Sequence, residues 1–431
     1  MAKQTIQSIR GMEDVLPEEA AYFQYLEATA RRVFGRAQYR EIRTPLLEPT
    51  ELFARSAGDS SDIVVSKQMY TFLDPGERSN TLRPEGTAGV VRAMIEHGVL
   101  KQTAQQKLFY AGPMFRYEKP QKGRLRQFNQ IGIEVFGVAH AAADAEIIVL
   151  CVEFLRAVGF RDVSVKLNNL GDREDRQAYN ARLREALERA AGEGWCPQCV
   201  ERARVNPMRV FDCKEERCRA LAAGLPAVGD FLGEAARAHF AVLRSLLEAC
   251  EVPYEIAPEL VRGLDYYSRT VFEIVQGGLG AQNAIVGGGR YDYLVEELGG
   301  PPTPGVGMSI GVERLILAMK SLGLTPPAEA PPVAIVLAVD ETAMPAAFRL
   351  ASAARAEGAA VALDLQPRSP KAGLKAANRL GVGVAIIIGA DEAARGVAQW
   401  KDLAVGTQTE VPLPEALPRL TALSDSTLPN R

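Results

Sequence analysis

The stretch KLFYAGPMFRYEKPQKGRLRQFNQIGIEVF, residues 107–136, decides the fold that this sequence predicts. Two runs rich in apolar residues are joined by a basic segment, which is typical of two neighbouring strands and their loop. Side chains of a strand alternate between its faces. One face of the second strand therefore carries Ile131, Ile133 and Val135. The other face carries Phe128, Gln130, Gly132, Glu134 and Phe136. Polar groups beside a small glycine predict the floor of a polar pocket and not a core face.

The loop between the strands is cationic. Arg116 and Glu118 lie on one side of the end of the first strand, and residues 119–126 contain four basic residues and no acid: Lys119, Lys122, Arg124 and Arg126. Cations above a carboxylate-lined floor suit a ligand that carries both a polyphosphate and an amine. An exposed hairpin with a solvated loop explains these residues alone equally well.

Length and composition describe an ordinary globular protein of two or three domains. The chain has 431 residues, of which 47% are hydrophobic and 24% charged, with a net charge of -3. A nucleic-acid partner would have to be met by local basic patches. We expect no membrane span and no secretory signal peptide, and therefore a cytoplasmic protein. Six cysteines in so long a chain do not predict a disulfide framework.

Strands and helices alternate along the chain. The sequence predicts a helix and turn over 12–39, a strand over 69–73, a helix from about Pro84 to Glu96 and a helix over 144–159. A further strand is predicted over 41–48, where Pro45 confines it to a sheet edge or an irregular pairing. Strand character returns at 254–275, and residues 305–315 run from a strand into a helix.

Three composition changes predict the domain boundaries. Residues 172–250 are rich in Arg, Glu and Ala, which indicates a helical insertion inside a domain that covers 1–325. Residues 326–332 form a proline-rich linker. Residues 333–431 alternate strands and helices, which predicts a C-terminal α/β domain with a largely parallel sheet.

These stretches together resemble the histidyl-tRNA synthetases, a family of class II aminoacyl-tRNA synthetases. Thr44-Pro45, the stretch from Arg116 to Phe128, and residues 311–315 (GVERL) are similar to the three class motifs. The tighter histidine-specific matches are RGLDYY at 262–267, GGGRYD at 287–292 and TLRPEGT at 81–87. The resemblance implies a catalytic domain with an antiparallel sheet flanked by helices, an anticodon-binding C-terminal domain, and a homodimer, since the first motif lies at the dimer interface in the class.

The activity that the resemblance implies has two steps. ATP activates L-histidine to histidyl-adenylate, and the histidyl group then passes to the 3' end of tRNA(His). Cations must be placed in advance where two anions meet. The implied ATP ligands, with Mg2+, are Arg116 at the α-phosphate, Arg124 and Arg314 at the far phosphates, Glu118 at the adenine amino group and Phe128 stacked on the ring.

The resemblance also implies the histidine pocket. Arg262 would bridge the substrate carboxylate and the α-phosphate, because an arginine fork fits two neighbouring oxyanions. The implied partners of the ammonium group are Glu85, Thr87 and Gln130. Those of the imidazole are Glu134 and Tyr267, with Tyr266 in the wall. Alternatively, Glu85 only suits a helix N-terminus, and the two tyrosines are ordinary strand aromatics.

The sequence departs from the family at a few positions. Leu125 and Asn129 stand where Tyr and His are common, and Tyr293 stands where Gly is common. None of these removes a group that meets substrate charge. The chain's own histidines, His97, His140 and His239, fall outside every motif, so no side-chain imidazole is expected in the mechanism.

A second function fits the same fold. Catalytically silent relatives of these synthetases serve as histidine-binding regulatory subunits of ATP phosphoribosyltransferase. They usually lack the C-terminal domain and the arginine motif. Both are present here, in residues 333–431 and at Arg262, which favours the synthetase.

Two further features leave alternatives open. Cys196, Cys199, Cys213 and Cys218 fall in the insertion, where they could bind Zn2+ or stay four reduced thiols; the second spacing is wider than usual and the family does not generally need zinc. On a helix predicted over 370–380, Lys371, Lys375 and Arg379 share one face. That face could contact tRNA phosphates or be solvated.

Overall fold

The computed structural model describes residues 6–57, 68–102, 105–119, 123–190, 192, 194–262, 266–277, 284–328 and 330–427. Within the quoted sequence motifs, residues 120–122, which include Lys122, and residues 263–265 lie outside the described residues. The chain divides into two compact units, Met1–Pro326 and Pro327–Arg431. No helix among the described residues is both long and apolar enough to cross a membrane.

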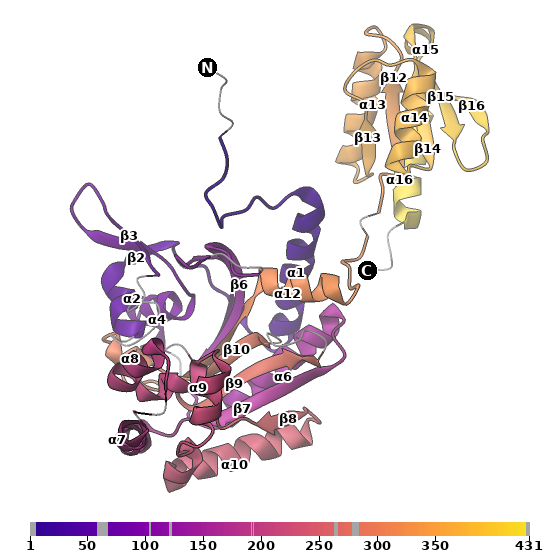
Figure 1. The fold of residues 1–431 in the computed structure, drawn as a ribbon. Coiled ribbons are helices and arrows are strands. Elements are labelled where there is room, and N and C mark those ends of the chain that lie inside the picture. Colours follow the sequence, from indigo (N-terminus) through magenta and orange to yellow (C-terminus); the bar gives the residue numbers. More distant parts are fainter. Residues whose placement is uncertain are drawn as a thin grey trace. The chain divides into compact units, whose positions relative to one another are not determined.

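An eight-stranded sheet forms the centre of the first unit (Figure 1). Its strands, in spatial order, are β1 (Arg40–Glu41), β5 (Gln106–Phe115), β6 (Gln127–Phe136), β11 (Gly305–Gly311), β10 (Ala284–Arg290), β9 (Ser268–Gln276), β7 (Val163–Asn169) and β8 (Tyr254–Ile256). Neighbours run antiparallel except at the two edges, where β1 pairs with β5 and β8 with β7 in parallel. The predicted antiparallel sheet flanked by helices is confirmed.

Each face of this sheet carries its own apolar core. Three helices cover one face: α1 (Pro17–Arg36), α6 (Ala142–Val158) and α12 (Val312–Ser321). Ile131, Ile133 and Val135 of β6 point into that core and are at most 1% exposed, which confirms the predicted apolar face. The other face packs on α4 (Thr87–Glu96) and on the insertion, with Tyr266 and Tyr267 among the buried residues.

A smaller sheet stands beside the main one. Its order is β2 (Leu47–Pro49), β4 (Ser79–Leu82) and β3 (Tyr70–Leu73). Three short helices complete this region: α2 (Thr50–Ala57), α5 (Val99–Gln102) and α11 (Leu294–Glu297).

The insertion is helical, as predicted. It consists of α7 (Arg173–Arg189), α8 (Pro197–Val205), the 3-10 helix η1 (Pro207–Asp212), α9 (Glu216–Ala222), the 3-10 helix η2 (Val228–Phe231) and α10 (Glu234–Ala249). Helix α10 also contributes to the main core of the first unit. Leu243 and Leu247, one turn apart on α10, are fully buried in the same core as α6.

Two local predictions were wrong. The strand expected over 41–48 is divided into β1 and β2, and the prolyl residue Pro45 lies between them. The helix expected from Pro84 starts only at Thr87. Glu85 explains the later start, because its carboxylate accepts hydrogen bonds from the backbone N–H groups of Thr87 at 2.6 Å and Ala88 at 2.8 Å.

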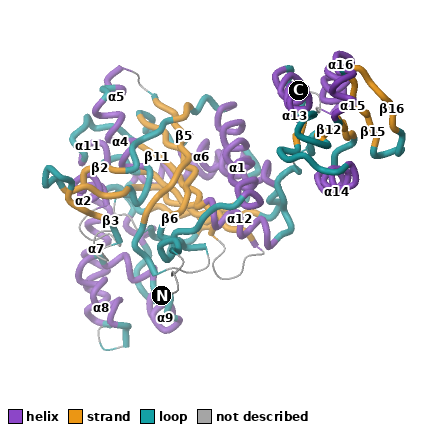
Figure 2. The backbone as a smooth tube through the Cα atoms, turned by 90° about the horizontal axis from the view of Figure 1, so that it is seen from above, coloured by secondary structure: helices purple, strands orange, loops and turns teal. Residues whose placement is uncertain are grey.

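The C-terminal unit is an α/β layer structure (Figure 2). Its five strands follow the order β13 (Val361–Leu363), β12 (Ala334–Ala338), β14 (Val384–Ile388), β15 (Val397–Asp402) and β16 (Gln408–Pro412). β13, β12 and β14 run parallel to one another, and β15 runs antiparallel to both of its neighbours, β14 and β16. The helices are α13 (Met344–Ala356), α14 (Pro370–Leu380), α15 (Ala390–Arg395) and α16 (Leu413–Thr427).

Candidate active site

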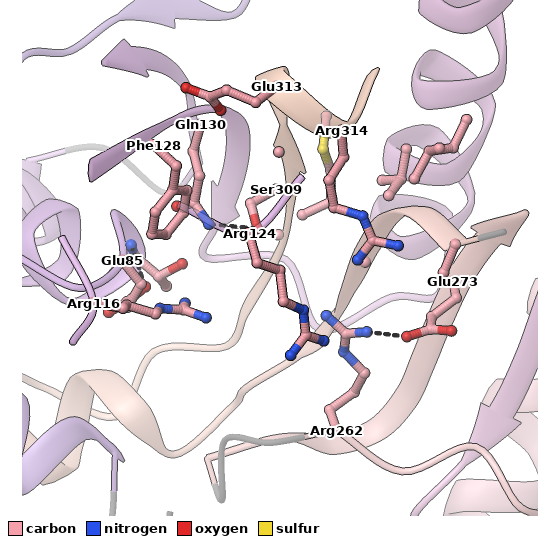
Figure 3. A pocket seen from close by; sticks show the side chains of 18 of the residues that line it. Glu85, Arg116, Arg124, Phe128, Gln130, Arg262, Glu273, Ser309, Glu313 and Arg314 are labelled. Carbon is pink, nitrogen blue, oxygen red and sulfur yellow. Dashed lines mark hydrogen bonds and ion pairs between the residues drawn. The ribbon is translucent and has the colours of Figure 1, made fainter. Parts of the chain in front are cut away.

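A cavity of about 380 Å³ opens on the central sheet of the first unit (Figure 3). Its floor comes from β6, β10 and β11, and its walls come from the segments before α4 and after β5, from the segment around Arg262, and from the start of α12. It is lined by almost every side chain that the resemblance implied for ATP and histidine: Glu85, Thr87, Arg116, Glu118, Arg124, Phe128, Gln130, Arg262, Tyr266, Tyr267 and Arg314.

The polar floor predicted on β6 is present. Gln130 is 7% exposed, and its Nε2 donates to Ser309 Oγ of the neighbouring strand at 3.5 Å. Its buried Oε1 has no hydrogen-bond partner within the described residues. Gly132 is required between Gln130 and Glu134, because a Cβ there would lie 2.4 Å from the hydroxyl oxygen of Tyr110. The floor thus offers an acceptor atom to a ligand.

Glu134 is fully buried next to the cavity. Its carboxylate accepts a hydrogen bond from Thr87 Oγ1 at 2.7 Å and another from the hydroxyl of Tyr291. Burial raises the pKa of Glu134 to about 8, although the two hydroxyl donors oppose that shift. Gly307 on β11 is equally constrained, because a Cβ there would meet Glu134 Oε2. A carboxyl with a pKa near neutrality can accept or share a proton with a bound base.

Four arginines surround the cavity. Figure 3 shows the side chains of Arg124, Arg262 and Arg314 pointing toward one region, while Arg116 lies beside Glu85. Burial lowers the pKa of Arg314, and the positive charges of Arg124 and Arg262 add to that effect. Arginine keeps its charge all the same, so the mutual repulsion favours binding of a multiply charged anion.

Three of these arginines have neighbours that orient them. Arg116 Nε donates to the carbonyl oxygen of Pro84 at 2.8 Å, and its guanidinium lies 5.4 Å from the centroid of the Phe128 ring. Arg262 forms an ion pair with Glu273 of β9. Arg124 lies 3.6 Å from Glu118, a pair whose members are 41% and 20% exposed. An exposed pair of this kind contributes little stability and separates at small cost when a stronger partner arrives.

Sequence reasoning missed three side chains at this site. Tyr291 lies inside the GGGRYD motif, but only the structure shows that its hydroxyl reaches Glu134. Glu273 lies in none of the recognised motifs. Its position on a strand that pairs with the glycine run could have indicated that it faces the site. Glu313 belongs to the GVERL motif, and its carboxylate accepts the backbone N–H of Asn129 at 2.8 Å.

Arg290 of the GGGRYD motif has a structural task. Its side chain is fully buried, and it pairs with Asp144 on α6 and with Asp292 at 2.8 Å. His239 on α10 approaches Asp144 at 3.4 Å, so this histidine is structural, as expected. The buried cluster fixes the end of β10 and with it the adjacent Tyr291.

The remaining predicted residues lie elsewhere. Lys371, Lys375 and Arg379 are exposed on α14 in the C-terminal unit. The four cysteines of the insertion lie close together, apart from the residues that line the cavity.

Comparison with known proteins identifies the two units. The family model described as histidyl-tRNA synthetase matches residues 11–315, and one described as anticodon binding domain matches residues 333–423.

The similarity to individual relatives extends over the whole chain. The histidine–tRNA ligase of Thermosynechococcus vestitus is 47% identical over 96% of this chain and 95% of its own length. That of Cyanothece sp. is 46% identical over 97% of both chains. The crystal structure of the apo histidyl-tRNA synthetase of S. aureus superimposes with a TM-score of 0.81 at 33% identity, covering 97% of this chain and all of the other. The chain belongs to the histidyl-tRNA synthetase family of aminoacyl-tRNA ligases.

Proposed function

We propose that this chain activates L-histidine with ATP and transfers the histidyl group to tRNA(His). The observation that carries the proposal is the division of one cavity into two ends. One end gathers three arginines (Figure 3), and the other combines buried carboxyl, hydroxyl and amide groups with Arg116 beside them. The histidine carboxylate attacks the α-phosphorus, pyrophosphate leaves, and the terminal ribose hydroxyl of the tRNA then displaces AMP from the carbonyl carbon.

The arginine end would bind ATP. Arg116 would hold the α-phosphate, with Arg124 and Arg314 on the far phosphates. Phe128, already stacked under the Arg116 guanidinium, would stack on adenine, and Glu118 would accept from the adenine amino group once Arg124 has turned to the phosphates. Mg2+ accompanies the phosphates and neutralises part of their charge. The cavity has carboxylate oxygens of the kind that Mg2+ prefers, on Glu273 and Glu313.

The polar end would bind histidine. The buried Oε1 of Gln130, which has no partner within the described residues, is an acceptor for the α-ammonium group, together with Glu85 and Thr87. Glu134 and Tyr267 would meet the two ring nitrogens, and Tyr266 would form the wall. A side chain that cannot pair with these groups leaves them buried and unsatisfied, which is the physical source of specificity.

Arg262 would join the two ends. Its side chain enters the cavity beside those of Arg124 and Arg314 (Figure 3). We propose that it binds the histidine carboxylate and the α-phosphate together, so that the reacting oxygen and phosphorus are held close. Glu273 positions its guanidinium for this task.

The wider assignments follow from the same family. We propose a cytoplasmic homodimer, with residues 1–325 as the catalytic domain, 326–332 as a linker and 333–431 as the anticodon-binding domain. Two assays test the function. Histidine-dependent exchange of pyrophosphate into ATP and aminoacylation of tRNA(His) are both expected. Histidine binding without either activity would instead support the regulatory-subunit alternative.

A further inference from the structure

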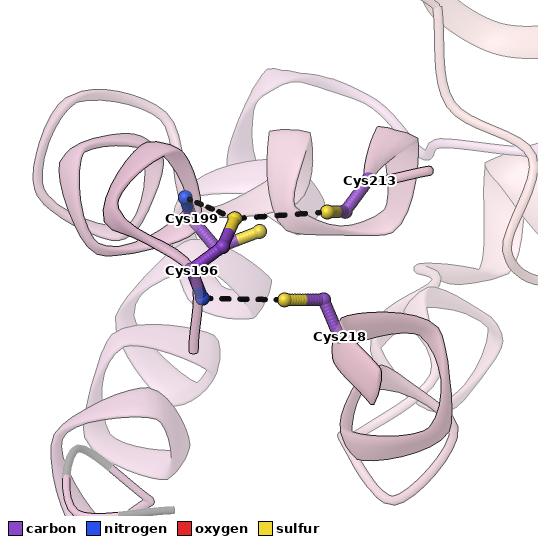
Figure 4. Close-up of side chains that lie close together, drawn as sticks. All are labelled: Cys196, Cys199, Cys213 and Cys218. Carbon is purple, nitrogen blue, oxygen red and sulfur yellow. Dashed lines mark hydrogen bonds between the residues drawn. The ribbon is translucent and has the colours of Figure 1, made fainter. Parts of the chain in front are cut away.

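Four cysteines of the insertion form a compact cluster (Figure 4). Cys196 immediately precedes α8, Cys199 lies in its first turn, Cys213 follows η1, and Cys218 lies on α9. Their sulfur atoms all lie within 4.8 Å of one another, and those of Cys196 and Cys213 are 3.9 Å apart. Figure 4 shows the four side chains converging from three separate elements.

This geometry suits a tetrahedral metal ion. A zinc ion with Zn–S bonds of about 2.3 Å sets its sulfur ligands about 3.8 Å apart. The cysteines carry free thiols and are each at most 9% exposed. Backbone N–H groups also donate to the sulfurs: that of Cys196 to Cys218 at 3.3 Å and that of Cys199 to Cys196 at 3.4 Å. Such donors stabilise thiolates and orient them toward a metal.

An apolar role explains the cluster less well. The four residues form a cluster of their own, with only Trp195 packed against it among the partly buried hydrophobic residues that the structure describes. The neighbouring sequence is highly charged: Lys214, Glu215, Glu216 and Arg217 separate the last two cysteines. A metal would instead bind all four thiolates and tie down three short elements that are too short to be stable alone.

We propose that Cys196, Cys199, Cys213 and Cys218 bind one zinc ion, which holds the insertion in place. An all-sulfur site without an open position is a structural site and not a catalytic one. The proposed zinc site is linked to the histidine pocket through η1, which ends next to Cys213. Met208 and Val210 of η1 pack in the same buried cluster as Tyr266 and Tyr267 of the proposed histidine pocket. The zinc ion thereby supports the wall of that pocket from outside.

Metal analysis of the full-length protein tests this proposal. Protein purified without chelator should contain about one zinc ion per chain. Exchange for Co2+ should give intense thiolate-to-cobalt charge-transfer bands and the visible bands of a tetrahedral ion. Removal of zinc with a chelator should lower Tm by roughly 5 °C, and added Zn2+ should restore it.

Serine variants locate the site. Cys199→Ser and Cys218→Ser should each lose most of the zinc and the Co2+ spectrum. The matched control is Cys250→Ser, because Cys250 is exposed and outside the cluster; it should keep both. Wild-type protein in which the four cluster thiols titrate in addition to that of exposed Cys250, with less than about a tenth of an equivalent of metal, would overturn the proposal. So would disulfides within the cluster, or bound iron with the absorption of an iron–sulfur centre. Because these readings use wild-type protein, a variant that fails to fold cannot decide the matter.

Discussion

Arg262 is the residue proposed to bind two oxyanions, and among the described residues its guanidinium pairs with Glu273. Arg262→Ala should therefore lower kcat for pyrophosphate exchange by about a hundredfold or more, with a much smaller change in histidine binding. Arg262→Lys should recover little of the loss, since a point charge cannot fork between two oxyanions.

Kinetics of pyrophosphate exchange and calorimetric titration with histidine measure the two effects separately. Arg244→Ala is the control, because Arg244 is an exposed arginine on α10 that contacts Tyr254. Exchange by the Arg262→Ala variant near the wild-type rate would show that Arg262 does not act on the reacting groups.

The raised pKa of Glu134 predicts that the stability of the folded protein depends on pH. Its pKa is about 8 in the folded protein and about 4.3 in an unfolded chain. Between these values the folded state binds a proton that the unfolded state has lost, so the contribution of this group to stability falls as pH rises from about 5 to about 8. The full effect is on the order of 5 kcal/mol.

Glu134→Gln should remove this dependence, because the amide does not ionise. The variant should therefore become more stable relative to wild type as pH increases across that range, so that its free energy of unfolding minus that of wild type increases. Urea unfolding at several pH values measures it, with Glu153→Gln on the exposed side of α6 as the control. A difference between Glu134→Gln and wild type that stays constant with pH would refute the assignment.

At the level of elements, local patterns predicted well and long-range contacts did not. The alternation in β6 correctly separated its apolar face from Gln130 and Glu134. The start of α4 was wrong because the side chain of Glu85 bonds the first N–H groups, which sequence propensity does not reveal. The contact of Tyr291 with Glu134 joins residues 157 positions apart, so only the folded sheet brings them together.

Helix α14 shows both results in one element. Its predicted ends are confirmed: Ser369 Oγ accepts from the N–H of Ala372 at 3.4 Å, and Gly381 adopts a left-handed conformation. The sequence also predicts that Ala377 and Leu380, on the side opposite the basic residues, pack on the sheet. Ala377 is buried, but Leu380 is 44% exposed, so the prediction is wrong for the last residue of the helix.

The basic face of α14, formed by Lys371, Lys375 and Arg379, predicts a tRNA contact. All three side chains are exposed. The double variant Lys375→Glu and Arg379→Glu should raise KM for tRNA and leave pyrophosphate exchange unchanged, because exchange needs no tRNA. Each lost phosphate contact should reduce the salt slope of tRNA binding by about one unit.

Filter binding across a range of salt concentrations measures that slope. Arg349→Glu on α13 is the control for a charge reversal elsewhere, since Arg349 is exposed in the same unit but on another helix. A double variant with the tRNA affinity and salt slope of wild type would mean that the face is only solvated.

The whole molecule predicts self-association through the segment around Thr44-Pro45. Large apolar side chains are exposed at the start of β2 and in β3. Leu46 is 42% exposed, Leu47 39%, Phe72 47% and Leu73 66%. These residues belong to the small β2-β4-β3 sheet or directly precede it. They lie on or next to the two outer strands of that sheet. Exposed apolar residues gathered on one sheet are typical of an interface, and a two-fold axis would bury them on both chains.

Light scattering coupled to size exclusion should therefore give a mass of twice 46.7 kDa. Leu47→Glu combined with Leu73→Glu should shift the mass toward that of one chain, because charges at a buried interface are unfavourable. Val405→Glu is the control, since Val405 is 71% exposed but lies in the C-terminal unit.

If wild type is monomeric and fully active at nanomolar concentration, the apolar residues of the small sheet need another explanation. If instead the double variant loses the dimer and pyrophosphate exchange together, while its helical content stays that of wild type, the interface supports the catalytic cavity that begins a few residues beyond β4.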